Sequence, residues 1–164
     1  MRFAHRQCCI GIVAAAMLAA TPAYAGRTTY TVPVSVTVLS GCTVVALPLV
    51  FNIPVPINGN VDSATSIAVR CTPNTAFVLD IDNGLHANGV NRRVFNATAN
   101  AFIKYDIFKD PPHSNVWGTG SAKNLSGNSG PTGLVTYPVY GRVSSSTNLK
   151  AGGYTDTLTV TINF

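Results

Sequence analysis

The amino-acid sequence predicts an all-β fold, an antiparallel sandwich or barrel. Almost no stretch beyond residue 25 has helical periodicity, and short runs rich in β-branched and aromatic residues dominate instead. Turn-forming pairs separate these runs about every ten residues, which is the spacing of short strands in such folds. The pairs are Ser40-Gly41, Asn58-Gly59, Pro73-Asn74, Asn83-Gly84, Asn88-Gly89, Pro111-Pro112 and Gly152-Gly153.

The first 25 residues have the three parts of a secretory signal peptide. A basic start, an apolar run and a small-residue cleavage site follow one another: Arg2, His5 and Arg6, residues 8–20, and Ala23-Tyr24-Ala25. A transmembrane anchor is the alternative, but the apolar run is shorter than the roughly 20 residues that a span needs. We therefore expect residues 1–25 to be a signal peptide, residues 26–40 an N-terminal segment and residues 41–164 one β domain.

Two cysteines remain once the signal peptide is removed. Cys8 and Cys9 leave with it, so Cys42 and Cys71 are the one possible pair. An oxidising compartment permits their disulfide, and two unpaired thiols would be unusual there. The loop-entropy relation predicts that the bridge contributes about 3–4 kcal/mol to stability.

The charge composition argues against a nucleic-acid partner. The formal net charge is +5, but only 10% of residues are charged, and two of the arginines belong to the signal peptide. The remaining basic residues are scattered, and only Arg92 and Arg93 are adjacent. Glutamate is absent, and Thr, Ser, Asn and Gly supply the polarity. This composition fits an exported β-protein better than a cytosolic enzyme.

The N-terminal segment contains a strand pattern with one apolar face. Apolar side chains occupy every second position, at Tyr30, Val32, Val34, Val36 and Val38, and residues between them are Thr31, Pro33, Ser35 and Thr37. A terminal strand this apolar needs a groove that buries it. The pattern leaves open whether that groove belongs to the same molecule or to a neighbour.

The remaining strands are expected at Cys42–Val45, Ser66–Cys71, Ala76–Asp82, Arg92–Phe95, Ala101–Phe108, Leu134–Val143 and Tyr154–Phe164. Prolines restrict residues 47–56 to edge or irregular structure. Residues 110–133 are expected to form a long surface loop around a short strand at Trp117. Tyr154, Leu158, Val160, Ile162 and Phe164 share one apolar face, on which Asp156 is the polar exception, expected at a rim.

Few residues suggest catalysis or metal binding. His86 and His113 lie among turn residues without metal-ligating neighbours, which favours solvated loop histidines. Asp80 and Asp82 could form a glycosidase pair, but Asp82-Asn83-Gly84 already has a turn explanation. Trp117 could stack on a sugar, although a lone aromatic residue more often fills a core. We expect no enzyme, no cofactor, no metal site and no small-molecule substrate.

Several motifs together resemble the spore coat U family, which includes subunits of archaic chaperone–usher pili. They are Gly41-Cys42-Thr43-Val44, Ile67-Ala68-Val69-Arg70-Cys71, Asp82-Asn83-Gly84, Arg92-Arg93, Tyr105-x-Ile107-Phe108-x-Asp110, Trp117-Gly118 and the closing Gly153-Tyr154-x-Asp156-Thr157-x-x-Val160-x-x-x-Phe164. The closing motif is the most specific, and the resemblance covers essentially all of the mature chain.

The resemblance implies an incomplete immunoglobulin-like sandwich that is completed by donor-strand complementation. Residues 26–40 would then be the donor segment and residues 41–164 a pilin domain, with Leu158, Val160, Ile162 and Phe164 in the acceptor groove. The implied partners are other copies or related subunits, a periplasmic chaperone and an outer-membrane usher, during export through the periplasm to a surface pilus that serves adhesion or biofilm formation. The alternative is a secreted monomeric binding module whose own N-terminal strand fills its groove.

Overall fold

The computed structural model describes residues 27–53, 59–145 and 149–164, so the expected signal peptide lies outside the described residues. The chain divides into two units, Met1–Val36 and Thr37–Phe164. Residues 27–36 of the first unit form neither helix nor strand. Within the described ranges, the model contains no helix that is long and apolar enough to cross a membrane.

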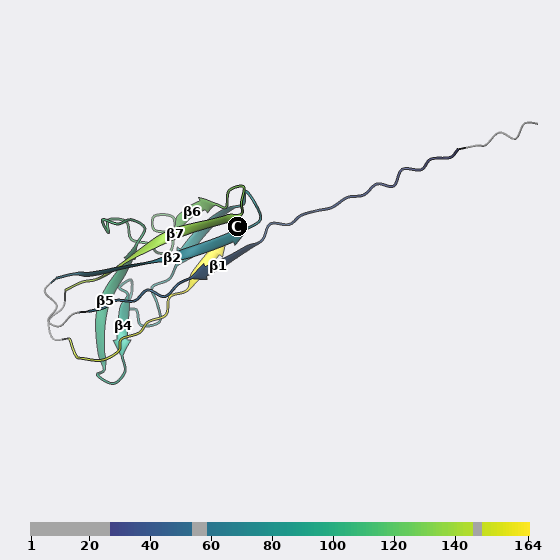
Figure 1. Ribbon diagram of the computed structural model, residues 1–164. Coiled ribbons are helices and arrows are strands. Elements are labelled where there is room, and N and C mark those ends of the chain that lie inside the picture. Colours follow the sequence, from purple (N-terminus) through teal and green to yellow (C-terminus); the bar gives the residue numbers. More distant parts are fainter. Residues whose placement is uncertain (1–26, 54–58, 146–148) are drawn as a thin grey trace, which may run out of the picture. The chain divides into compact units, whose positions relative to one another are not determined.

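The described residues of the second unit form eight β-strands, and Figure 1 shows how they are arranged. They are β1 Cys42–Ala46, β2 Val61–Cys71, β3 Ala76–Ile81, β4 Arg93–Asn96, β5 Ala101–Phe108, β6 Leu125–Asn128, β7 Leu134–Val143 and β8 Val160–Asn163. One sheet has the order β1-β2-β7-β5-β4 and the other β6-β3-β8. Every pairing between these strands is antiparallel. The predicted all-β antiparallel class is therefore confirmed.

The core lies between the two sheets and follows the predicted alternation. Alternate residues of β2, β3 and β5 are buried, namely Ile67, Val69, Cys71, Phe77, Leu79, Ile81, Ile103, Tyr105 and Ile107. Trp117 is 0% exposed among them, and its Nε1 donates to the Leu79 carbonyl at 3.3 Å. Trp117 therefore fills the core, and stacking on a sugar is excluded for this side chain.

Pro138 lies inside β7 without interrupting it, although a proline within a strand usually marks an edge or a break. Pro138 faces Ser66 of β2, whose carbonyl accepts from Leu47 on the opposite side at 3.1 Å. Ser66 and Pro138 are therefore a non-hydrogen-bonded pair. The missing N–H of Pro138 would point away from β2, where pairing with β5 begins only at Tyr140. Consequently, the proline costs the ladder no bond.

Other boundaries differ where tertiary contacts outweigh local sequence. The strand β2 starts at Val61 rather than Ser66, because its polar half pairs with β7 up to Val143. The strand β6 lies in the expected loop, and a Cβ on its Gly127 would overlap the Tyr137 hydroxyl and the Phe77 ring. Near Trp117 the expected strand is only an isolated bridge between Val116 and Phe108.

The C-terminal strand is shorter than expected. Only Val160–Asn163 pair with β3, as β8, although the alternation of half-buried and exposed side chains extends back to Tyr154. The preceding residues bond elsewhere: Thr155 pairs with Phe95 of β4 through both backbone groups, at 2.9 and 3.0 Å. The segment thus passes from the edge of one sheet to the edge of the other.

The predicted disulfide between Cys42 and Cys71 is confirmed. It joins directly opposed residues of β1 and β2, whose Cα atoms are 4.0 Å apart. It closes a loop of sequence separation 29.

Replacing both cysteines by alanine is expected to lower the free energy of unfolding by about 3–4 kcal/mol, because the unfolded chain loses its cross-link. Urea denaturation of the oxidised chain and the double variant measures the difference. Equal unfolding midpoints would contradict the expectation.

Candidate functional site

The main concave site is an apolar groove of about 940 Å³ in the second unit. Its floor consists of inward-facing residues from β2, β3, β5 and β7: Ile67, Ile81, Ile103, Tyr105, Ile107, Val139 and Val143. Its walls are residues 46–53, which follow β1, and residues 149–158, which precede β8. β1 and β8 are each the last strand of their sheet. Edge strands offer unpaired backbone groups, so the site suits an extended apolar peptide.

The wall after β1 is only loosely bound to the sheet. Leu49, Phe51 and Ile53 alternate with exposed residues and pack on the core. Beyond the backbone bond from the Leu47 amide to the Ser66 carbonyl, the segment is held by side-chain hydroxyls: Ser63 Oγ donates to the Val50 carbonyl at 2.6 Å and Thr65 Oγ1 to the Leu47 carbonyl at 3.2 Å. The expected edge or irregular character of this stretch is confirmed over the described residues 47–53.

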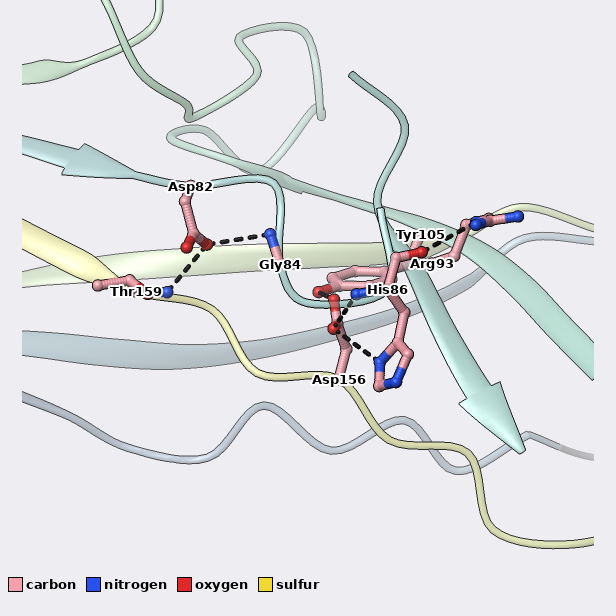
Figure 2. Close-up of polar contacts among 7 residues, drawn as sticks. All are labelled: Asp82, Gly84, His86, Arg93, Tyr105, Asp156 and Thr159. Atoms are coloured by element: carbon pink, nitrogen blue, oxygen red, sulfur yellow. Dashed lines mark hydrogen bonds and ion pairs between the residues drawn. The ribbon is translucent and has the colours of Figure 1, made fainter. Parts of the chain in front are cut away.

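The wall before β8 is pinned by Asp82 at the end of β3. The Asp82 carboxylate accepts from the amides of Thr159 at 2.9 Å and Gly84 at 3.0 Å (Figure 2). In addition, the Asp82 amide donates to the Thr159 carbonyl at 3.1 Å, and the Leu85 amide to the Thr157 carbonyl at 3.2 Å. Asp82 therefore fixes the C-terminal wall, which gives this carboxylate a structural role beside the turn Asp82-Asn83-Gly84. Asp80 likewise accepts from Gly120 and Asn163.

A polar cluster of His86, Tyr105 and Asp156 lies at the groove, in which Tyr105 and Asp156 are buried and the His86 side chain is 32% exposed. Asp156 Oδ2 accepts from the Tyr105 hydroxyl at 2.8 Å, and Oδ1 accepts from the His86 amide at 3.1 Å and lies 3.2 Å from His86 Nδ1 (Figure 2). The Asp156 side chain is only 2% exposed, so the expected rim position is wrong. Burial, followed by the Asp156 carboxylate, raises the pKa of Tyr105 well above its usual range. This phenol therefore stays protonated and donates.

Gly84 is required beside this cluster for two reasons. Its φ of +85° lies in the left-handed region, where L side chains are strained. A Cβ at this position would also overlap the Asp156 carboxylate. The turn Asp82-Asn83-Gly84, recognised in the sequence as a turn signal, thus permits the close approach of the C-terminal wall.

Acid should weaken the Asp82 contacts. Burial opposes ionisation of Asp82, but the hydrogen bonds from Thr159 and Gly84 outweigh it and hold its pKa below the ordinary 3.8. A depressed carboxyl pKa stabilises the fold above the unfolded-state pKa, and that stability is lost as pH falls through the lower folded-state value.

Asp82→Asn should therefore cost about 1 kcal/mol at pH 6 and less as the pH drops below about 4. Urea unfolding of both chains between pH 6 and 2 measures this. A stability difference independent of pH would contradict the assignment.

The residues expected in the acceptor groove fall into two groups. Leu158 and Val160 line the groove. Ile162 instead packs half-buried against the core opposite Leu79, and Phe164 is 58% exposed. The expected donor residues Tyr30, Val32, Val34, Val36 and Val38 are 76–89% exposed and belong to no strand.

The expectation of solvated loop histidines is wrong for His113, whereas His86 is a partly exposed loop residue. The His113 side chain is 6% exposed and packs edge-on against Phe108 and Tyr140. His86 pairs with Asp156, 70 positions away in the chain, so local spacing could not reveal it. No group of three or more potential metal ligands occurs among residues 27–53, 59–145 and 149–164.

Sequence reasoning missed two parts of the site. The first is the wall of Leu49, Phe51 and Ile53, for which alternation along the sequence is the signal that could have found it. The second is the partner set of Asp156. The sequence signal for it is a carboxylate on an otherwise apolar strand face. Such a carboxylate is buried with the face, and it then needs hydrogen-bond donors nearby.

The comparisons with known proteins agree with this architecture. The model of the Spore Coat Protein U domain family matches residues 28–161, and the chain belongs to this family. Protein U of Myxococcus xanthus is 33% identical over 109 residues, covering 60% of this chain and 58% of that protein.

Among solved structures, a chaperone–tip adhesion subunit pre-assembly complex, CsuC–CsuE from archaic chaperone–usher Csu pili of Acinetobacter baumannii, matches with a TM-score of 0.62 and 30% identity. The match covers 78% of this chain and 41% of that one. A chaperone–tip adhesin complex of CFA/I fimbriae biogenesis has a TM-score of 0.42 and 13% identity, with 71% and 38% coverage. The match to the CsuC–CsuE complex confirms the immunoglobulin-like sandwich class. The chain spans 58% of Protein U and 41% of the matched CsuC–CsuE chain.

Proposed function

We propose that this protein is a structural pilus subunit of a chaperone–usher system. Residues 26–40 of one copy would insert as a strand into the groove of the next copy and so form the polymer. The observation that carries the proposal is an apolar groove, walled by the segments that continue the edge strands β1 and β8, in a chain whose donor segment has a matching apolar face. Strand addition uses both features, because backbone bonds supply affinity and alternate side chains fill pockets.

The energetics favour insertion. Burying the four valines at positions 32, 34, 36 and 38 would contribute roughly 6–12 kcal/mol before entropic costs. New backbone bonds along the β8 edge add to this, while Pro33 supplies no N–H. The Pro33 ring lies on the polar face of the segment, so the valine face stays continuous.

The partners and the location follow from the family. The CsuC–CsuE complex pairs a pilus subunit with its chaperone. By analogy, this chain would be exported to the periplasm, held there by a chaperone, passed to an outer-membrane usher and displayed at the cell surface. Adhesion or biofilm formation would be the role of such a pilus, and no enzymatic step is required.

Co-expression with the cognate chaperone and usher tests the proposal. The expected result is a soluble chaperone complex in the periplasm and surface polymers that give ladders resistant to SDS. A chain that stays monomeric at all concentrations and recovers no chaperone would overturn it.

A secreted monomeric binding module is the second candidate. A separate pocket of about 440 Å³ favours it, since the charged residues Arg92, Asp106 and Lys123 line that pocket together with residues 118–122. In this case the chain's own N-terminal strand would fill its groove. The same co-expression decides between the two, because a binding module forms no ladder.

A further inference from the structure

We propose that Asp156 positions the C-terminal wall of the groove for strand insertion, held in place by Tyr105 and His86. This inference rests on the proposed function and identifies the residue that keeps the acceptor site in its binding shape. The His86, Tyr105 and Asp156 side chains are called the Asp156 cluster below (Figure 2).

The position of Asp156 in the wall is the first observation. Tyr154, Leu158 and Val160 all contribute to the groove, and Asp156 lies on the same face between them. Burying a carboxylate is costly unless hydrogen bonds satisfy it, and an apolar residue would usually pack there at lower cost. The Asp156 carboxylate therefore holds the wall in one defined position, whereas an apolar side chain there would only fill the space.

The origin of its partners is the second observation. Tyr105 belongs to β5, whereas His86 belongs to the loop between β3 and β4. Arg93 of β4 fixes that loop by donating Nε to the His86 carbonyl at 3.0 Å, and the His86 ring lies 5.2 Å from the Phe95 ring. Asp156 thus links the wall to β5 through Tyr105 and to the loop between β3 and β4 through His86. Both of these side chains are fixed by the structure around them.

The bonding of the wall is the third observation. The backbone of the wall is bound at Thr155, Thr157 and Thr159 by groups that do not line the groove, from Phe95 to the end of β3. Asp156 is bound from the inner side, because Tyr105 also lines the groove floor. Without this contact the inner face of residues 154–158 would have to be ordered by the incoming strand. Ordering a segment on binding lowers affinity, and a pre-organised site avoids that cost.

Binding of a synthetic peptide with the sequence of residues 28–40, carrying a fluorophore, tests the inference. The full mature chain is used in its monomeric fraction, and anisotropy gives affinity and association rate. Asp156→Asn leaves one acceptor oxygen for the Tyr105 hydroxyl and for the amide and ring nitrogen of His86, so the peptide should bind at least about ten-fold more weakly, mainly through slower association. Asp62→Asn serves as the matched control, since Asp62 pairs with Arg142 outside the groove.

Two further variants separate positioning from general stability. Tyr105→Phe removes one hydroxyl and should weaken binding about three- to ten-fold, even if Asp156→Asn fails to fold. His86→Leu should weaken binding similarly, and His86→Asn should restore most of the loss, because an asparagine amide can donate where Nδ1 does. A general loss of stability would lower the unfolding midpoint, but peptide binding would not then recover in His86→Asn.

The outcomes separate a failure of the proposed function from a failure of the positioning role of Asp156. If the wild-type chain does not bind the peptide, the proposed function fails, and the positioning role of Asp156 fails with it. If the wild type binds while Asp156→Asn and Tyr105→Phe bind equally well, the positioning role alone is overturned.

Discussion

A chain carrying Val36→Asp is expected to fold on its chaperone and to form no polymer. Val36 lies at the centre of the donor face, and in the proposed polymer its side chain enters an apolar pocket of the next copy. A carboxylate without a partner in such a pocket costs several kcal/mol or more. SDS ladders and chaperone co-purification, measured on the same preparation, report the two properties separately.

Ser35→Asp is the matched control for this change. Ser35 lies on the opposite face of the segment, so the same charge should face solvent and polymers should form. Polymerisation of Val36→Asp at the wild-type level would contradict the donor assignment. Failure of Val36→Asp to fold even with chaperone would instead show that the segment completes its own domain.

The reciprocal change, Leu158→Asp, is expected to disable the acceptor. Leu158 lines the groove and packs against the core beside β8, so a charge there disfavours any apolar occupant. The donor segment of this variant is unaltered. Size-exclusion chromatography with light scattering should find no chain longer than the single subunit when Leu158→Asp is the one form present.

Thr157→Asp controls for the introduced charge. The Thr157 side chain is exposed, and its structural contact is the backbone carbonyl that accepts from Leu85. This variant should polymerise. Equal loss of polymer in Thr157→Asp and Leu158→Asp would show that the charge disturbs the wall as a whole rather than the groove surface.

The sequence predicted most of the sandwich because strand periodicity is a local signal. The buried alternate residues of β2 and β3 lie in the expected strands Ser66–Cys71 and Ala76–Asp82, and the Cys42–Cys71 bridge follows from export and elimination. The strand β5 was expected, but its alternation did not tell which face is buried. The short strand β6 could not be predicted, since a Leu-Ser-Gly-Asn stretch pairs only because β3 offers it an edge.

The site was predictable only in part, because strand alternation reports local sequence and not contacts between distant residues. Alternation identified Leu158 and Val160, but it could not tell that the same face continues past the groove at Ile162 and into solvent at Phe164. The Asp156 cluster joins residues 51 and 70 positions apart, so no local pattern encodes it. Only the fold brings such groups together.

The most direct test of subunit-to-subunit strand insertion mixes the two defective chains. Val36→Asp retains a normal groove and Leu158→Asp retains a normal donor, so one productive contact remains between them. Native mass spectrometry of the mixture should show a heterodimer of one copy each and nothing longer, while each chain alone stays monomeric. A mixture that remains monomeric, or that polymerises beyond the heterodimer, would contradict the account.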